Sequence, residues 1–533
     1  MAVKPVKTPF TNMSFTPDIP SAALGANEYN SGYNIETDIR GINSVAGDDE
    51  ILNSIQGNVI FTTAGFRNND IYWFVVATRE GHWYAQTTSG ISNVTPTANT
   101  YVSTSYTDST AITDSWSGTT LIINDNVNPP MYLNSTDTEF HLYSNDANAA
   151  PNSYNWNYNP NYTALRAGFV RLYATPNVGS LLIAGNLQAD TTANTVVNMP
   201  TTVRWSQNFG TNFVPLSWVP TLTNTANELE VPVRGPVIDG FPIGGNFFVC
   251  SYWDTVIFSP IAYTTTTAPI LGVRLVNQGR GLLNENCWAN ADDVVYGLDA
   301  RDIWVFNGGN FKSLGNQRVK NYFYKNLNPT YANLTFLVNN TEKNQLEIYY
   351  PDLTSTGHCN KMLAYRYDLD VFQPPRDVSA AVHGVETPIW SGNTYNPATR
   401  TVVYGQGSTP NSQLIQKDIG TSFINSAPIP TLFERDNISF GQPYSNKVQV
   451  HRILPEVVGT GTVNITVGGA DSVGANITYR PTVEMAIDTN NPWVQIDQND
   501  QRVVSVKIET NSNVNSYTMT AINWQNTIIE DDR

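Results

Sequence analysis

At 533 residues the chain is longer than one hydrophobic core usually covers, so a repeat architecture or several domains is expected. Its 29 basic and 45 acidic residues give a net charge of -16, which argues against a protein that grips nucleic acid through its phosphates. Only 14% of the residues are charged. Polarity comes instead from Asn, Thr, Ser and Tyr, which suit sheets and turns better than helices.

The first 50 residues show little hydrophobic periodicity and hold prolines at positions 5, 9, 17 and 20. We predict for residues 1–50 an extended N-terminal arm that ends in one or two strands leading into the next domain. The segment Ile39–Ile42 is the expected hairpin. An arm of this kind is either disordered or held by a neighbouring element.

From Ile55 to about residue 420 the chain repeats one pattern, in which an apolar run, a polar turn and a second apolar run follow one another. Such pairs of β-branched and aromatic runs predict short antiparallel strands joined by hairpins. Uniformly apolar strands are those buried on both faces, as in radially stacked sheets. The pattern occurs at residues 69–86, 118–137, 179–206, 245–260, 292–311, 333–352, 361–377 and 401–418.

The spacing between these units varies, which fits four-stranded blades with connecting loops of different lengths. We therefore predict an all-β fold in which residues 51–430 form a β-propeller of about six or seven blades. A set of stacked β-sandwiches is the competing architecture. Residues 431–533 show longer strands with strict alternation, as in Val503–Ile508, and predict a separate small C-terminal β-sandwich.

Two insertions interrupt the repeats. Residues 143–163 are nearly all turn formers with spaced aromatics, so we expect a long surface loop there. The run Thr264–Thr267 is a shorter spacer. Both loops are candidates for contact with another subunit, although a solvated loop is the simpler interpretation of each.

The sequence carries no recognisable catalytic or cofactor-binding motif. Phosphate-loop, dinucleotide-binding, nucleophile-elbow and HExxH motifs are missing. His358 and Cys359 are neighbours, but adjacent side chains on a strand point to opposite faces and cannot easily share a metal ion. The paired acids Asp48-Asp49 and Asp292-Asp293 precede apolar runs, where Asp commonly satisfies turn donors. The pair Asp531-Asp532 lies near the C-terminus. We assign no catalytic, cofactor-binding or metal residues and expect no enzyme.

The cysteines and the N-terminal residues indicate in which cellular compartment the protein is made. Cys250, Cys287 and Cys359 are too few for a disulfide scaffold, and free buried thiols are expected. The opening MAVKPVKTPFTNMSF lacks the apolar stretch of a secretory signal, and no run approaches the length of a membrane span. We therefore expect a soluble protein that is made in a cytoplasm and does not insert into membranes.

The stretch Arg234–Leu314 holds two copies of the repeating pattern. Its phrases GPVIDGFPIGGNFFVCSYWDTVIF and GVRLVNQGRGLLNENCWANADDVVYGLDARDIWVFNGGNF resemble the propeller of tail nozzle or hub proteins of short-tailed, podovirus-type bacteriophages. This group includes the tail tubular protein B family and the related packaged-DNA-stabilisation tail proteins. The opening phrase GYNIETDIRGINSVAGDDEIL and the domain starting near Arg435 are similar to the family's first strands and closing β-domain. The family's pattern is carried here by Gly279, Gly281, Leu282, Trp288, Asp293, Tyr296, Asp302, Trp304, Phe306 and Gly308.

The resemblance implies a structural virion protein without catalysis. It implies a homohexameric nozzle ring at the distal end of the tail, docked on the tail adaptor ring and made in the host bacterial cytoplasm. Tail fibres or tailspikes and the host surface are further implied partners. The ring would retain the packaged viral DNA and conduct it during ejection without binding it specifically. An acidic channel wall fits this role because Lys and Arg would bind the phosphates.

Two other functions stay open at this stage. A receptor- or glycan-binding propeller of a phage tail or surface is favoured by aromatic clusters such as Trp156 and Tyr158. A glycan hydrolase is the weaker alternative, because no acid pair lies at a diagnostic spacing. Four further tryptophans could stack on sugars, although aromatics at equivalent positions of repeats more often pack between blades. These are Trp83, Trp253, Trp304 and Trp390.

Overall fold

The computed structural model describes most of the chain, and the statements below concern the described residues. These are residues 4–52, 55–68, 72–87, 90–97, 101–102, 106–107, 110–143, 155–175, 179–210, 213–222, 224–261, 270–391, 394–407, 413–423, 427–438, 440, 446–487, 493–510 and 516–529. Within them no helix is long and apolar enough to cross a membrane. The helical elements there are α1 (Lys320–Asn326) and the short 3-10 turns η1 (Ser21–Ala23) and η2 (Ala332–Leu334).

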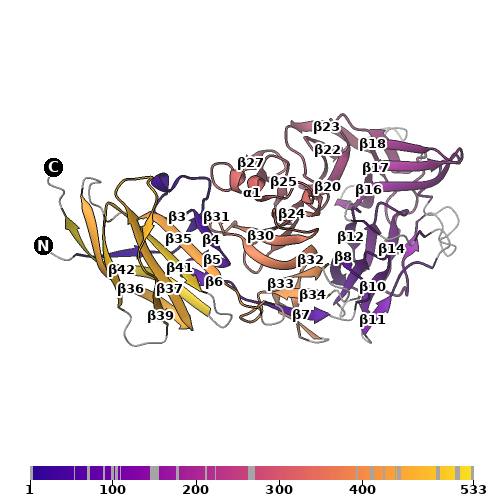
Figure 1. Ribbon diagram of the computed structural model, residues 1–533. Helices are drawn as coiled ribbons and strands as arrows, with labels where there is room; N and C mark the ends of the chain where they lie inside the picture. The colour runs from indigo at the N-terminus through magenta and orange to yellow at the C-terminus, as the bar shows by residue number, and fades with distance from the viewer. Residues whose placement is uncertain are drawn as a thin grey trace.

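The chain folds into a β-propeller and a β-sandwich that lie side by side, with both chain ends on the sandwich (Figure 1). Five blades of the propeller are separate four-stranded antiparallel sheets. Blade 1 holds β8 (Val59–Phe66), β9 (Tyr72–Thr78), β10 (Trp83–Thr87) and β11 (Gly90–Asn93). Blade 2 holds β12 (Thr113–Ser117), β13 (Thr120–Asn124), β14 (Met131–Leu133) and β15 (His141–Leu142). Blade 3 holds β16 (Tyr162–Thr175), β17 (Gly179–Thr191), β18 (Val196–Trp205) and β19 (Asn227–Glu230).

Blade 4 holds β20 (Val237–Ile243), β21 (Asn246–Ser251), β22 (Asp254–Pro260) and β23 (Leu271–Gln278). Blade 5 holds β24 (Trp288–Ala291), β25 (Val294–Leu298), β26 (Ile303–Phe306) and β27 (Phe311–Ser313). The last two blades share one eight-stranded sheet. Blade 6 holds β28 (Phe336–Asn340), β29 (Gln345–Tyr350), β30 (Cys359–Arg366) and β31 (Val371–Phe372). Blade 7 holds β32 (Arg376–Ser391), β33 (Thr394–Gln406), β34 (Leu414–Lys417) and, as its outer strand, β7 (Asp48–Leu52).

The predicted all-β propeller is therefore confirmed, and it has seven four-stranded blades. The most continuous apolar runs of the sequence lie in second strands of blades, such as β9 and β13, and every residue of these two strands is buried. Each has a strand on both sides and a neighbouring blade against each face. Continuous apolar runs rather than alternating ones are the expected result of this double burial.

The sandwich is built from both ends of the chain. One sheet orders its strands as β40-β36-β42-β6-β5, and β1 pairs with β42. The other runs β38-β37-β41-β35-β4, and β39 pairs with β37. From the N-terminal side come β1 (Lys4–Pro9), β4 (Ser31–Tyr33), β5 (Ile35–Asp38) and β6 (Gly41–Ser44), and nearby β2 (Ser14–Phe15) and β3 (Glu28–Tyr29) pair with each other. The remaining strands are β35 (Thr431–Ile438), β36 (Lys447–Thr460), β37 (Thr462–Ala470), β38 (Thr478–Tyr479), β39 (Val483–Ala486), β40 (Val494–Gln501), β41 (Val503–Thr510) and β42 (Ser516–Ile529).

The predicted N-terminal arm over residues 1–50 is not a separate element in the structure. The predicted hairpin at Ile39–Ile42 is present, since β5 pairs with β6. However, β4, β5 and β6 join sandwich sheets, and β7 belongs to the propeller. The arm prediction differs because the partners of these short strands lie more than 300 residues away, where local periodicity gives no signal.

The predicted surface loop at residues 143–163 is only partly described, since residues 144–154 lie outside the described part. Its two described ends are anchored: Tyr143 and Trp156 are buried in the core of blades 2 and 3. The Trp156 ring packs edge-on against Trp218 at 4.7 Å, and its Nε1 donates a hydrogen bond to the Leu165 carbonyl. The spacer Thr264–Thr267 falls outside the described residues.

A buried network of ion pairs joins the closing blade to its neighbours. Arg376 on β32 contacts Asp48 on β7 at 2.7 Å and Asp418 at 2.6 Å, and the Arg376 side chain is only 1% exposed. Lys417 on β34 contacts Asp418 at 2.7 Å and Glu347 on β29 at 2.8 Å. The network therefore connects the outer strand of blade 7 with blade 6.

Lys343 extends this network into the sandwich. Its ammonium lies 3.0 Å from Asp418 and 2.7 Å from Glu36, which belongs to strand β5. Burial alone would raise the pKa of Glu347, but the Lys417 ammonium holds that pKa below its ordinary value. Burial likewise opposes the charge on Asp418, whose pKa is nevertheless kept well below its usual range by Lys343, Lys417 and Arg376. Glu347 and Asp418 are therefore both charged at neutral pH.

Hydrogen bonds also hold the two domains together. Asn34 donates from its amide to Asp377 at 2.8 Å and accepts from the Asp377 backbone. Thr37 and Gln373 exchange two further bonds at 2.7 and 2.9 Å. The chain crosses between the two domains near Gly47 and again near Ser422. These two segments lie so close that a Cβ at Gly47 would stand 2.1 Å from the Ser422 carbonyl. Only glycine fits at that crossing.

Removal of residues 1–52 tests the role of the N-terminal strands. The deletion takes β5 and β6 from the sandwich and β7 from blade 7, so both domains lose strands and the propeller ring stays open. We expect the shortened chain to lose cooperative thermal unfolding, as followed by near-ultraviolet circular dichroism. A control that lacks only residues 1–3 should unfold like the full chain. A shortened chain with an unchanged midpoint would contradict the proposed closure.

Arg376→Met tests the buried network. The variant leaves Asp48 and Asp418 without their guanidinium partner, and breaking a buried ion pair in this way costs about 3–5 kcal/mol. The matched control is Arg366→Met on β30, whose pair with Asp368 is partly exposed and should contribute at most about 1 kcal/mol. Denaturant unfolding of both variants measures the difference. Equal losses would show that burial of the network has no special effect.

Candidate functional site

The first strands of the blades surround the propeller axis, and one arginine links four of them. Arg171 on β16 donates to both carboxylate oxygens of Asp239 on β20, at 2.9 and 2.6 Å. Its Nη1 also donates to the Asp114 carbonyl on β12 at 2.9 Å, and its Nη2 to the Asn286 Oδ1 before β24 at 2.7 Å. The guanidinium thus holds together blades 2, 3, 4 and 5.

Asp239 is completely buried, and its charge is satisfied by several donors at once. Besides Arg171, the Trp288 indole donates to it at 2.8 Å, and the backbone amides of Gly240 and Asn286 donate at 2.8 and 3.2 Å. These donors satisfy the hydrogen-bonding capacity of the buried carboxylate. The Arg171–Asp239 pair is therefore a structural hub of the axis.

Side chains of other blades also make contacts across the axis. The Asn286 amide donates to the Ile112 carbonyl at 2.9 Å, which connects blade 5 with blade 2. His383 on β32 contacts the Thr62 carbonyl at 2.8 Å through Nδ1, and its ring stacks on Phe61 at 4.2 Å. Burial lowers the pKa of His383, so the ring is neutral at physiological pH. These side chains leave only a narrow cavity of about 60 Å³ among Phe61, Asn286 and His383.

Above this constriction the axis widens into a larger cavity of about 780 Å³, which we call the funnel. The described residues that line it come from four places: Thr107, Thr110 and Ala111 before β12, Tyr252 in the β21–β22 turn, Leu283–Glu285 before β24, and Thr330–Asn333 before β28. Residues 108 and 109 of the first segment lie outside the described part. The funnel shares Thr110, Ala111, Glu285 and Asn333 with the constriction, so the two cavities are adjacent. Its volume is within the range of small-molecule sites.

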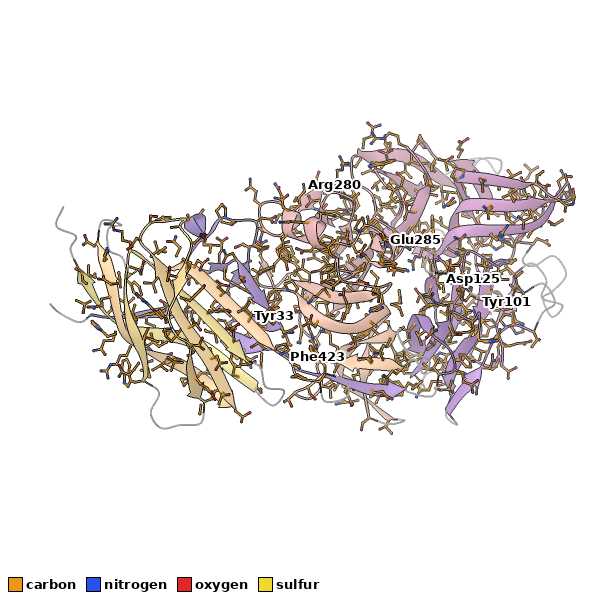
Figure 2. All side chains as sticks on the ribbon, in the orientation of Figure 1. Tyr33, Tyr101, Asp125, Arg280, Glu285 and Phe423 are labelled. Carbon is orange, nitrogen blue, oxygen red and sulfur yellow. The ribbon has the colours of Figure 1, made fainter. Side chains whose placement is uncertain are left out.

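Glu285 lies where the funnel meets the constriction, and Figure 2 shows it in the middle of the propeller. Burial raises the pKa of its carboxyl to about 7; the Asp239 carboxylate acts in the same direction, while Glu285's own backbone amide and Arg171 oppose the shift. No described side chain forms an ion pair with Glu285. The carboxyl therefore faces the cavity in an equilibrium between its charged and neutral forms at neutral pH.

Sequence reasoning did not single out Glu285, because one acid between two asparagines carries no motif. The acids that it did single out have other places. Asp48 lies in the buried ion network, where burial raises its pKa against the effect of Arg376. Asp292 and Asp293 form the turn between β24 and β25 and border a cavity of about 460 Å³ on the opposite face of the propeller. Asp531-Asp532 falls outside the described residues.

Three of the four tryptophans considered for sugar stacking are in the core. Trp83 and Trp304 are fully buried, and Trp390 is 6% exposed, as expected for packing residues. Only Trp253 is substantially exposed, at 45%. The cluster around Trp156 is likewise no surface platform, since that ring is fully buried. An apolar sequence context cannot tell an exposed aromatic from one packed between blades.

The thiols and histidines show no candidate metal centre in the described part of the chain. Cys250, Cys287 and Cys359 are free and buried, as predicted, and burial raises the pKa of each. The Cys359 thiol donates to the Leu334 carbonyl at 3.1 Å and is not shared with His358. No group of three or more His, Cys, Asp or Glu residues gathers around a common point among the described residues.

Comparison with models of protein families and with curated protein sequences gives no match. Similar solved structures include a computationally designed protein, Ika8, which is 10% identical over 69% of this chain and 99% of that chain, with a TM-score of 0.34. A chain of the Mitotic Checkpoint Complex is 10% identical over 70% and 92%, with a TM-score of 0.38. The WD40 repeats of RRP9 are 7% identical over 70% and 99%, with a TM-score of 0.40. At these identities and scores the likenesses carry no argument about function, and the strand order itself defines the propeller.

Glu285→Gln tests the environment of the funnel carboxyl. In the wild type the folded state keeps a proton that the unfolded state releases, so stability falls as pH rises from about 4.5 to about 7. Glutamine imitates the neutral acid and removes this loss. At 1.4 kcal/mol per pKa unit, we expect the variant's advantage to grow by about 1–3 kcal/mol between pH 5 and pH 8, because cavity water weakens the full effect.

Denaturant unfolding at the two pH values measures this change. Asp293→Asn is the matched control, since that carboxyl is exposed in a turn on the opposite face. It reports what the loss of a surface carboxylate alone does to stability at each pH. A Glu285→Gln effect that does not vary with pH would mean that the carboxyl is fully hydrated.

Proposed function

We propose that this chain is a structural component of the tail of a short-tailed bacteriophage, and not an enzyme. In this proposal it forms a homohexameric nozzle ring that docks on the tail adaptor ring, retains the packaged DNA and conducts it during ejection. The observation that carries the proposal is the phrase from Gly279 to Gly308, whose order of glycines, aromatics and acids resembles that family. The net charge of -16 supports it, because a wall of this sign repels DNA phosphates.

The positions of the phrase residues are compatible with a structural role. Leu282, Trp304 and Phe306 are fully buried in the core that blade 5 shares with blade 4. A Cβ at Gly281 would stand 2.0 Å from the Ser251 carbonyl of blade 4, so this glycine permits the close contact of two blades. The phrase thus describes how neighbouring blades pack, which is a property of a fold and not of a catalytic site.

The axis of the propeller is not the path that we propose for DNA. Arg171 and Asn286 cross it with buried hydrogen bonds, and the open cavity there is about 60 Å³. A duplex would instead pass through the centre of a ring made by several copies of the chain, in which each copy contributes the same two surfaces to its neighbours. Fibres or tailspikes and the host surface would then meet the outer face of that ring.

A receptor- or glycan-binding propeller is the second candidate function. Its first support, the aromatic cluster at Trp156, is lost because that ring is buried. The funnel around Glu285 is the feature that favours it now, because it is an open cavity lined by polar and aromatic side chains. The two functions are compatible in one protein, since a ring subunit can also carry a ligand site.

Electron microscopy of the purified chain tests the nozzle proposal. Samples of the protein alone and mixed with adaptor-containing tail fractions of a phage lysate should show sixfold rings with a central pore in at least one of them. Tail fractions without the added protein serve as the control for rings already present. Monomers in both samples would overturn the proposal and leave the receptor-binding propeller as the better candidate.

A further inference from the structure

We propose that the outer half of strand β18 in blade 3 is a contact site for a second copy of this chain, in which the two β18 strands pair antiparallel about a two-fold axis at Val197. This contact goes beyond the nozzle role. Neighbours in a cyclic ring meet through two different surfaces, whereas a two-fold contact uses one surface twice and joins two free chains or two rings.

One side of β18 is open along part of the strand. On its first side β18 pairs with β17, and residues 196–199 lie opposite residues 187–190 there. On its second side β19 pairs only with residues 202–205 of β18. No other described strand pairs with β18. Residues 195–199 are therefore open on the second side, and we call them the β18 edge.

The hairpin between β17 and β18 determines which backbone groups of the β18 edge point outward. The Thr191 amide donates to the Thr195 carbonyl at 2.8 Å, so that carbonyl points toward β17. Residues of an antiparallel pair alternate between pointing toward and away from the partner strand, so Val196 and Asn198 direct their N–H and C=O groups away from β17. Two donors and two acceptors therefore stand at the open side, and no described strand pairs with them.

The β18 edge is accessible and carries no charge. Val196 is 56% exposed and Val197 is 37% exposed, and the hairpin of β17 and β18 projects from the propeller (Figure 1). Residues 191–203 include no charged side chain, and Asp190, opposite Val196, is paired with Arg166 at 2.5 Å. Natural proteins usually protect an exposed edge with charged side chains, a bulge or a covering segment. An edge without charge is suited to pairing with another strand.

The β18 edge is complementary to itself. When two copies pair antiparallel with Val197 opposite Val197, Val196 of each copy lies opposite Asn198 of the other. Both residues direct their N–H and C=O groups toward the other copy, so the two pairs form four hydrogen bonds between the chains. A shift of the register by one residue would place these groups opposite residues whose backbone points away. The apolar Val197 side chains then meet at the axis.

The charge of the chain favours a second copy at this place over other contacts between copies. Each copy carries a net charge of -16, so two copies repel one another and approach most easily where charged side chains are missing. A few paired residues bury much less surface than the roughly 1,200–2,000 Å² of a stable interface. We therefore expect a weak association that increases with protein concentration.

Disulfide cross-linking of the full-length chain tests the register. Val197→Cys should give a cross-linked dimer under mild oxidation, because position 197 lies opposite itself, at a Cβ spacing of about 4.5–5.5 Å that is close to disulfide geometry. Val196→Cys and Asn198→Cys are the matched controls. Each lies opposite the other position and should give at least about tenfold less dimer. The three native cysteines are buried and do not compete.

Sedimentation equilibrium tests the association without a cross-link. The wild type should show twofold association, of single chains or of rings, that increases with concentration. Val197→Lys places two like charges opposite each other and should weaken this association by about fivefold or more. Val458→Lys, on an exposed position of the sandwich, changes the net charge equally and should have no effect. Thermal unfolding verifies that each variant is folded.

Several outcomes would overturn this contact. These are equal cross-linking at positions 196, 197 and 198, no association at any concentration, or an equal effect of Val458→Lys. Sixfold rings in electron microscopy are a separate result, and Val197→Lys should form them as the wild type does. Loss of rings in that variant alone would place the β18 edge inside the ring contact and would also contradict the two-fold pairing.

Discussion

A propeller must close its ring, and here closure depends on a strand from the far end of the sequence. Strand β7 pairs with β34, so that Lys417 lies opposite Asp48 across more than 300 residues of chain. Backbone pairing alone would leave a short outer strand easily detached. The buried contact of Arg376 with Asp48 and Asp418 ties this strand to the blade, and Lys343 passes the connection on to Glu36 in the sandwich. The same network of ion pairs therefore closes the propeller ring and joins the propeller to the sandwich.

The propeller axis holds charged and polar side chains, whereas the interior of the blades is apolar. The second strands bury continuous apolar side chains, whereas Arg171 and Asp239 on first strands and Asn286 just before β24 meet at the axis. A buried charge is tolerated only when its hydrogen bonds are complete, and the Asp239 carboxylate meets that condition. Glu285 does not, since no described ion pair balances it. The Arg171–Asp239 network therefore belongs to the scaffold, whereas the Glu285 carboxyl borders the open cavities.

The sequence was a good guide wherever the decisive interaction is local. Alternation, turn residues and apolar runs predicted the hairpins, the propeller and the boundary near residue 430, because each depends on neighbours within a few residues. The hairpin at Ile39–Ile42 was predicted, but the pairing of the N-terminal strands with distant ones was not, since β4 finds its partner β35 only through the tertiary fold. Trp156 and Glu285 were missed for a related reason. Burial of an aromatic ring and the isolation of a carboxyl are set by side chains from several blades.

The pairing of the first strands with the last has a consequence for biosynthesis. Asn43 meets Thr518, 475 positions later, so the N-terminal strands emerge from the ribosome long before their partners exist. Blades 1 to 5 use contiguous sequence and can form during translation, but the ring and the sandwich must wait until the chain is almost complete. Such non-local pairing folds slowly and leaves strand edges exposed in the meantime. Expression yield should therefore respond to chaperone supply and growth temperature more than the stability of the finished protein would suggest.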